Sequence, residues 1–375
     1  MKRKLIFVLI SLFFLQCGRD QTHKKSEAEL ILATSCEYLW KHQSEDGGWH
    51  SEVHGLMKPG QALTPFIVFA LMDVPDSVYQ KPKDGVQKAL EFIRTHANAE
   101  GVLGLDDPDV LEYPNYSTAY ALRVLVKNGS GGDSSLIHRM VEYLVSQQFT
   151  EQRGLGPSQA AYGSWGLGEL RILKGKVGHV DVSHTRHILQ ALNEAGYHSE
   201  DMFKKATRFL RLLQKHPSHE SSPRKAYDGG FYFAPSSEDN KAGRDSLNVF
   251  RSYATPTCGG ILSLLETGHK SSDEPVKAAV KWLEANSSLE YPQGIPENDP
   301  DQWRKVLFFQ HLSSRAEVYR ALHWKGDWRG EMVKLLASRQ AEDRSFSNPY
   351  GAPNKEDDPL LATAFVVGIM KDVLW

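Results

Sequence analysis

The stretch that decides the fold runs from Ala226 to Gly268 and reads AYDGGFYFAPSSEDNKAGRDSLNVFRSYATPTCGGILSLLETG. It begins with a glycine turn between aromatic residues, DGGFY at 228–232. A polar loop follows, and Tyr253 then precedes an apolar segment that we expect to be helical over 257–267. Because glycine ends a helix in the left-handed conformation without a side-chain clash, this order predicts a helix end, a loop and a second helix.

The same order recurs along the whole chain. The apolar spacing i, i+3, i+4, i+7 of a half-buried helix is found at 32–39, 86–93, 137–144, 206–213 and 276–283, and less regularly at 332–339. A second expected helix follows each of these, at 63–71, 117–126, 183–195, 257–267, 314–323 and 360–373. Several first helices close on glutamine and glycine, at 43–48, 147–154 and 214–229. The pattern therefore predicts six helical hairpins.

Hairpins repeated in this way must bury their apolar faces against their neighbours. Six of them can close into an all-α ring, an (α/α)6 toroid, with second helices inside and first helices outside. An open superhelical solenoid is the alternative. Val366, Val367, Ile369 and Met370 form an apolar face on the last helix that suits docking against the first hairpin, so we expect closure. No linker rich in Pro, Gly or Ser divides the chain, which predicts one domain over 27–375.

Composition limits the partners. The formal net charge is -2, with no concentrated basic face, so we expect no nucleic acid. Cys17, Cys36 and Cys258 lie far apart, without the paired spacing that zinc sites use. We therefore expect neither a metal nor another cofactor, and no disulfide framework.

The N-terminus is typical of an export signal. Lys2-Arg3-Lys4 precedes about eleven mostly apolar residues, too few to cross a bilayer as a helix. We expect a lipoprotein-type signal over 1–16, acylation of Cys17 and a polar tether over 17–26. This predicts a cell-envelope protein held on the membrane by its lipid. A periplasmic or secreted protein, or a short membrane anchor, are the alternatives.

At this point the sequence resembles a known family. QSEDGGW at 43–49 resembles the glutamine-tryptophan repeat of squalene-hopene cyclases, which share an α/α toroid with other terpenoid cyclases and with protein prenyltransferase β-subunits. The stretch 228–265 is similar to bacterial prenyltransferase/squalene oxidase repeat proteins. The resemblance covers nearly the whole mature chain and implies a central cavity for a lipid-like substrate. One fold hosts many chemistries, so each active residue is compared separately.

Class II cyclases of this family protonate their substrate with the middle aspartate of an Asp-x-Asp-Asp-Thr motif. The matching segment here is Asp181-Val182-Ser183-His184-Thr185, in which Ser183 takes the place of the proton donor. A serine hydroxyl cannot protonate an alkene, so the usual carbocation start is not expected. Asp181 and His184, about one helical turn apart, are instead our candidate catalytic acid/base pair. The alternative is that Asp181 or Ser183 only caps the helix.

Protein prenyltransferases bind zinc through an aspartate and a cysteine two residues apart, with a later histidine. Cys258 lies near the matching place, but Pro256 stands two residues before it. Where the histidine would lie the sequence is LLAT at 360–363. The resemblance therefore does not imply zinc here, and Cys258 is expected to be a small buried apolar residue.

Other candidates for substrate binding are more dispersed. Tyr116, Trp165, Asp228 and Tyr253 are candidates on the inner helices and glycine turns, unless the aromatics only hold the repeats together. Arg251, His311 and Arg315 are polar candidates that suit a phosphate or carboxylate, or a surface ion pair. The acids at 106–112 and 356–358 precede inner helices, where we expect solvated charges or a cation site.

Three functions follow from this pattern. The first is an enzyme of the isomerase or transferase type that acts on an isoprenoid or other lipid-like substrate in the cavity. The second is a non-catalytic envelope protein that binds a lipid or a peptide. The third is a glycan-active (α/α)6 enzyme, which would need carboxylate pairs or a cation. The cavity lining distinguishes them, because aromatic walls suit lipids and acidic walls suit sugars.

Overall fold

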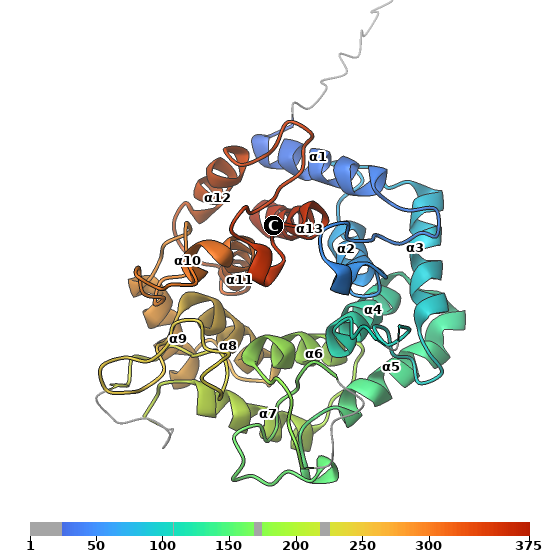
Figure 1. The fold of residues 1–375 in the computed structure, drawn as a ribbon. Coiled ribbons are helices and arrows are strands. Elements are labelled where there is room, and N and C mark those ends of the chain that lie inside the picture. The colour runs from blue at the N-terminus through green and yellow to red at the C-terminus, as the bar shows by residue number, and fades with distance from the viewer. Residues whose placement is uncertain (1–24, 108, 169–174, 218–225) are drawn as a thin grey trace, which may run out of the picture.

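The computed structural model describes residues 25–107, 109–168, 175–217 and 226–375. In this part of the chain the helices form two concentric rings (Figure 1). The inner ring contains α2 (Leu63–Met72), α4 (Pro114–Asn128), α6 (Val182–Glu194), α8 (Ala254–Glu266), α11 (Phe308–Ala321) and α13 (Pro359–Leu374). The outer ring contains α1 (Glu27–Lys41), α3 (Lys83–His96), α5 (Ser134–Ser146), α7 (Glu200–Leu213), α9 (Glu274–Ala285) and α12 (Trp328–Ala337). The predicted six hairpins of an all-α fold are confirmed.

The ring is closed. Each inner helix contacts the next, from α2 through α4, α6, α8 and α11 to α13, and α13 returns to contact α2 and α1. Val366, Val367, Ile369 and Met370, the apolar face expected to make this closure, are all fully buried. At the closing point His54 Nε2 also contacts Asp357 Oδ1 at 2.7 Å.

The glutamine-glycine turns join each outer helix to its neighbours by one repeated device. The amide of Gln43 donates to the carbonyls of Gly47 and Gly85, at 2.9 and 2.8 Å. Gln214 does the same to Gly229 and Pro275, at 3.0 and 2.7 Å. In each case the second carbonyl belongs to the first turn of the next outer helix. The turn thereby fixes how far apart successive outer helices lie.

In the third hairpin the residue that does this is Gln148, and not Gln147 as expected. Its amide donates to the carbonyls of Gly163 and Met202, at 3.0 and 3.1 Å. Gly163 therefore matches Gly47 and Gly229, and all three have φ between 85° and 91°. A Cβ on Gly163 would lie 1.9 Å from the carbonyl oxygen of Lys205, so glycine is required both for its conformation and for this close approach.

A threonine of the inner helix completes the repeat. The backbone N–H of Trp49 donates to Thr64 Oγ1 at 2.9 Å, and that of Trp165 donates to Thr185 Oγ1 at 3.3 Å. The same contact is made by Phe231 with Thr257 and by Phe346 with Thr363. Buried backbone donors need such partners, so the inner helix and the turn specify each other's position.

Two expectations are corrected. The helix expected to begin at Ser314 begins at Phe308, after the short helix α10 (Trp303–Val306).

Glu356, expected to be a solvated loop charge, is fully buried and accepts the N–H groups of Phe309 and Gln310, at 2.8 and 2.9 Å. Glu112 is also buried and accepts from Gly60 and Gln61, at 3.2 and 2.7 Å, just before α2. These carboxylates cap helix starts that sequence periodicity alone does not mark.

The predicted signal at 1–16 and the acylation site Cys17 lie outside the described residues. Ser26, the last residue of the predicted tether, caps α1 by accepting the N–H of Glu29. Among the helices of the described ranges, none combines the length and the apolar character that crossing a bilayer would need.

Candidate functional site

The inner ring surrounds a cavity of about 810 Å³, a size typical of small-molecule sites. Its two sides differ in chemistry. The apolar side comes from α2 and α13 and consists of Leu63, Phe66, Phe69, Ala70, Leu361, Ala364 and Phe365. The polar side comes from α6 and α11 and includes Ser183, His184, Arg186, His187, Ser314 and Glu317. Because α13 and α6 lie on opposite parts of the ring, the cavity is amphipathic across its width (Figure 1).

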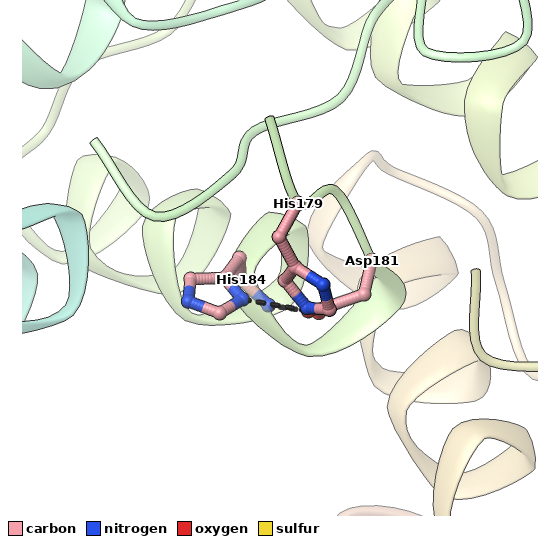
Figure 2. Close-up of side chains that lie close together, drawn as sticks. All are labelled: His179, Asp181 and His184. Carbon is pink, nitrogen blue, oxygen red and sulfur yellow. Dashed lines mark hydrogen bonds and ion pairs between the residues drawn. The ribbon is translucent and has the colours of Figure 1, made fainter. Parts of the chain in front are cut away.

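Asp181 and His184 lie together at the start of α6 (Figure 2). Asp181 is the N-cap, and its Oδ1 accepts the backbone N–H of His184 at 2.8 Å. Its Oδ2 lies 2.8 Å from His184 Nδ1. The capping and acid/base interpretations are therefore compatible, because each uses a different carboxylate oxygen.

His184 lines the cavity, and one nitrogen of its ring has no partner in the described part of the chain. His184 is 5% exposed, and its Nε2 is buried without a hydrogen-bond partner among the described residues. When Nδ1 carries the hydrogen that points to the Asp181 carboxylate, Nε2 is the ring nitrogen left to exchange a proton. An imidazole oriented by a carboxylate in this way has the geometry of a histidine general acid or base.

A second histidine, His179, holds the other side of Asp181. Its Nε2 lies 2.5 Å from Asp181 Oδ2, and its Nδ1 lies 2.8 Å from Asp239 Oδ1. Burial lowers the pKa of His179, but the two carboxylates outweigh it and raise the pKa to about 9. His179 is therefore an imidazolium at neutral pH.

The charge of Asp181 follows from these neighbours. Complete burial raises the pKa of its carboxyl group, while His184 and His179 together hold the pKa well below its usual value. The carboxylate therefore remains ionised although it is inaccessible to solvent. An ionised carboxylate with both oxygens accepting hydrogen bonds has no proton to give to an alkene.

His179, Asp181 and His184 are also the group of described residues whose donor atoms lie close enough together to hold a metal ion. The fit is poor. Asp181 Oδ2 is 2.5 and 2.8 Å from the two nitrogens, whereas ligands around a tetrahedral ion with bonds of about 2.1 Å are about 3.4 Å apart. The short contacts fit two N–H donors that share one oxygen. The expectation that no metal is used stays a prediction.

Aromatic residues of α4 pack beside Asp181 and His184. The ring of Tyr116 lies 4.2 Å from that of His184, and its hydroxyl is 2.5 Å from Ser183 Oγ. Burial and the nearby Asp181 raise the pKa of Tyr116 well above its usual value, so it is a neutral phenol. One turn along α6, His187 Nδ1 lies 3.3 Å from the hydroxyl of Tyr120. Burial and Arg186 lower the pKa of His187 well below its ordinary value, so this ring is neutral.

The polar side continues with a buried ion pair. Arg186 donates to Glu317 of α11, which also accepts from Gln190 at 2.7 Å. Burial raises the pKa of Glu317, but Arg186 outweighs it and lowers the pKa to about 2. The pair joins α6 to α11 and leaves fixed charges on the cavity wall.

Of the predicted site residues, Asp181, His184 and Tyr116 line the cavity, and the other six do not. Trp165 is fully buried behind the inner ring, with Nε1 donating to Leu144 O at 2.7 Å. Tyr253 is 1% exposed at the start of α8, and its N–H donates to Phe231 O at 3.1 Å. These aromatics join repeats, so we remove them from the proposed site.

The polar candidates are also structural in position. Asp228 accepts from Gly230 and Ser252, at 3.0 and 2.8 Å, and pairs with Lys215 at 3.1 Å. His311 and Arg315 are fully buried. His311 Nε2 contacts Ser288 O at 2.9 Å, and Arg315 donates to the hydroxyl of Tyr319 at 2.7 Å. Arg251, whose N–H donates to Gly243 O at 3.0 Å, also lies outside the cavity lining.

Sequence reasoning missed His179, His187 and Glu317. A signal existed for the two histidines, because HVDVSHTRH at 179–187 places His179 two residues before Asp181 and His187 one turn after His184. For Glu317 there was none, since it reaches the site from another hairpin.

Similar structures share this architecture. The type II terpene cyclase MstE from Scytonema aligns with a TM-score of 0.55 and 10% identity over 92% of this chain and 97% of that one. The chain is an α/α toroid. D-mannose isomerase aligns with a TM-score of 0.58 and 11% identity over 94% and 98% of the two chains. A protein from Actinoplanes aligns at 0.53 with 14% identity.

At such identities the likeness is one of fold. No profile of a known protein family matches the sequence, and no curated protein matches it. By their names, the two enzymes that share this toroid catalyse unlike reactions. The reaction of this chain must therefore be argued from its own cavity.

Proposed function

We propose that the protein is an acid/base enzyme that acts on an amphipathic, isoprenoid-like or other lipid-like molecule in the cavity of its toroid. The observation that carries this proposal is His184, a residue of the cavity lining whose Nε2 is buried and has no hydrogen-bond partner among the described residues. Its Nδ1 is held by an ionised carboxylate, which fixes the orientation of the ring and the tautomer.

In the proposed reaction His184 Nε2 accepts a proton from the substrate. The Asp181 carboxylate, 2.8 Å from Nδ1, stabilises the imidazolium that forms. His179 is already protonated and keeps Asp181 ionised, so Asp181 does not compete for that proton. Tyr116, a neutral phenol beside His184, can donate a hydrogen bond to a substrate oxygen. The reaction thus differs from alkene protonation by a carboxylic acid.

The two-sided lining supports an amphipathic substrate. Phe66 packs its ring against those of Tyr120 and Phe365, with centroids 5.1 Å apart in both cases, and offers an apolar surface. His184 belongs to α6, which lies on the opposite part of the ring from α13. An MstE variant that shares the fold, with a TM-score of 0.54, is described as binding geranylgeranyl dihydroxybenzoate, which has an apolar chain and a polar ring.

The test is incubation in D2O with a panel of prenyl alcohols, prenylated phenols, prenyl carboxylates and D-mannose, read by mass spectrometry and NMR. We expect a product or stable deuterium incorporation with a prenylated member. His184→Gln should reduce the rate at least about 100-fold, the usual contribution of a general base. The control is His138→Gln on the exposed face of α5, which should change nothing. A fully active His184→Gln protein would overturn the proposal.

A sugar is the second candidate substrate. The polar side of the cavity favours it, and D-mannose isomerase has the same fold. Deuterium on a carbon of D-mannose, and none on the prenylated compounds, would select this alternative. Binding of a lipid without any product would instead select the non-catalytic binding protein.

We also propose that the protein is exported and anchored by a lipid on Cys17. The support is the basic and apolar N-terminal segment that precedes this cysteine. Metabolic labelling with radioactive palmitate in a bacterial host should label the wild type and not Cys17→Ser. Equal labelling of both proteins would contradict the anchor.

A further inference from the structure

The end of the cavity at the last turns of the inner helices carries a cluster of charges, which we call the floor. Its members are Asp73, Arg123, Lys127, Glu194, Lys371 and Asp372. The negative end of a helix dipole favours cations at this position. The site of His184 lies at the opposite ends of the same helices, so the floor is a separate part of the cavity.

Three cations of the floor surround one aromatic ring on the apolar side. Arg123 Cζ lies 4.0 Å from the centroid of Phe69, and the Nζ atoms of Lys127 and Lys371 each lie 5.4 Å from it. Cations are attracted to the face of an aromatic ring, but this attraction is weak compared with a charge-assisted hydrogen bond. Each cation therefore needs an anionic partner as well.

Two of the three have such a partner. Arg123 donates to both oxygens of Glu194, at 3.0 and 2.6 Å. Lys127 Nζ lies 3.0 Å from Asp73 Oδ2. The remaining acid, Asp372, forms an ion pair with Arg320 of α11, with Nε 2.5 Å from Oδ1. Each carboxylate of the floor is thus already paired with a cation other than Lys371.

Lys371 is the cation of the floor that has no ion-pair partner among the described residues. It is 7% exposed, and no carboxylate of a described residue lies within 4.0 Å of its Nζ. Its ammonium has three donors, and the hydrogen bond it makes, to Phe69 O, is long at 3.4 Å. Burial lowers the pKa of Lys371 to about 8, against the opposing effect of Asp73 and Asp372. The group is still mostly charged at pH 7.

We propose that Lys371 binds the carboxylate or phosphate group of an amphipathic ligand whose apolar part lies along Phe66, Phe69 and Phe365. A buried cation on a cavity wall is stabilised when an anion supplies the acceptor that the protein lacks. The inference deepens the proposed function, because it makes the substrate an amphipathic anion and places its charged group away from His184.

The experiment measures binding by titration calorimetry with three probes of one chain length, dodecanoate, dodecyl phosphate and 1-dodecanol, the two anions below their micellar concentrations and the alcohol below its solubility limit. We expect at least one of the anions to bind about ten times more tightly than the alcohol, as one charge-assisted hydrogen bond provides. Dodecanoate and dodecyl phosphate then show whether a carboxylate or a phosphate is preferred.

The variant Lys371→Met keeps the length of the side chain and removes the charge. This variant should bind the two anions about ten times more weakly than the wild type does and should bind 1-dodecanol equally well. Lys371→Arg should keep most of the preference for the anions over the alcohol. Lys277→Met, on an exposed lysine of α9, is the matched control and should bind as the wild type does.

Equal binding of the anions and the alcohol by the wild type, no binding of any probe, or an unchanged preference in Lys371→Met would overturn the inference. The wild-type comparison holds even where a variant fails to fold. Binding needs no turnover, so a failure here leaves proton transfer at His184 untouched. A failure of the deuterium experiment likewise leaves the binding result standing.

Discussion

The starts of α2 and α6 occupy the same place in the repeat but present different residues to the cavity. Thr64 of α2 and Thr185 of α6 both receive the N–H of a tryptophan in the preceding turn. The residue before each threonine lines the cavity, and it is Leu63 in one helix and His184 in the other. The scaffold is therefore repeated, while the chemistry is local to one repeat.

The comparison continues one turn further along. Phe66 and His187 stand two residues after the matching threonines, and both line the cavity. The α2 face builds an aromatic wall and the α6 face a polar one, on one and the same backbone plan. A change at a threonine or a turn glycine should therefore damage the fold, and a change at the neighbouring position should damage the reaction.

The largest effect is expected from His184→Leu, which gives α6 the residue that α2 has. The proposed reaction should slow by about 10²–10⁴-fold because the proton acceptor is lost. The free energy of unfolding should fall by only about 1–2 kcal/mol, the cost of one lost partner of buried Asp181. Turnover and urea unfolding measured on the same sample check both parts, and retained turnover would break the comparison.

Gly163→Ala should have its main effect on stability and not directly on the reaction. At φ +90° a Cβ would lie 1.9 Å from Lys205 O, so the turn must move away from α7. We expect a loss of about 3–5 kcal/mol in the free energy of unfolding, in the range of severe backbone substitutions. Gly196→Ala is the control, because its φ is also positive, +74°, but no atom lies within 4 Å. Equal losses in the two variants would show that the close approach does not matter.

The third prediction concerns His179 and pH. Its folded pKa of about 9 lies above the ordinary value of 6.5, so its stabilisation is full below pH 6.5 and is lost as the pH rises through 9. We expect a loss of about 2 kcal/mol over this window, allowing for partial solvent screening. Urea unfolding at several pH values should show this loss in the wild type and much less of it in His179→Gln. An unchanged pH profile in the variant would contradict the imidazolium.

The capping acids should give a smaller effect. Burial raises the pKa of Glu112 to about 7, partly offset by the N–H groups of Gln61 and Gly60. Its stabilisation is therefore present below about pH 4.5 and is lost as the pH rises through 7. Between pH 5 and pH 8, the free energy of unfolding of Glu112→Gln should rise by about 1 kcal/mol relative to that of the wild type. Thermal melts of both proteins at both pH values test this. If the difference in stability between the two proteins is the same at pH 5 and pH 8, the pKa of Glu112 is not raised.

The smallest effect is expected at the ring closure. Asp357→Asn removes the charge that faces His54 at 2.7 Å, in a partly exposed position. Such pairs contribute about 0.5 kcal/mol. The buried face of α13 should hold the ring closed without it, so the melting temperature should change by only a degree or two. A large loss would mean that the polar contact, and not the apolar face, closes the toroid.

The sequence by itself determined the repeat. Apolar spacing gave the six hairpins, because a half-buried helix must repeat its apolar residues every three to four positions. The apolar face at 366–370 predicted the closed ring, and the pair Asp181 and His184 followed from the resemblance of 181–185 to the motif of class II cyclases. The start of α11 could not be found in this way. It depends on Glu356, which arrives from the next hairpin to satisfy Phe309 and Gln310.

Only the tertiary structure decided which residues face the cavity. Trp165 and Tyr116 are both aromatic and both close to inner helices, but one lies behind the ring and the other inside it. Glu317 reaches Arg186, and Lys371 reaches the ring of Phe69, across distances of more than a hundred residues in the chain. The physical reason is that periodicity fixes which face of a helix is apolar, whereas burial and charge at the site depend on helices that meet only when the ring closes.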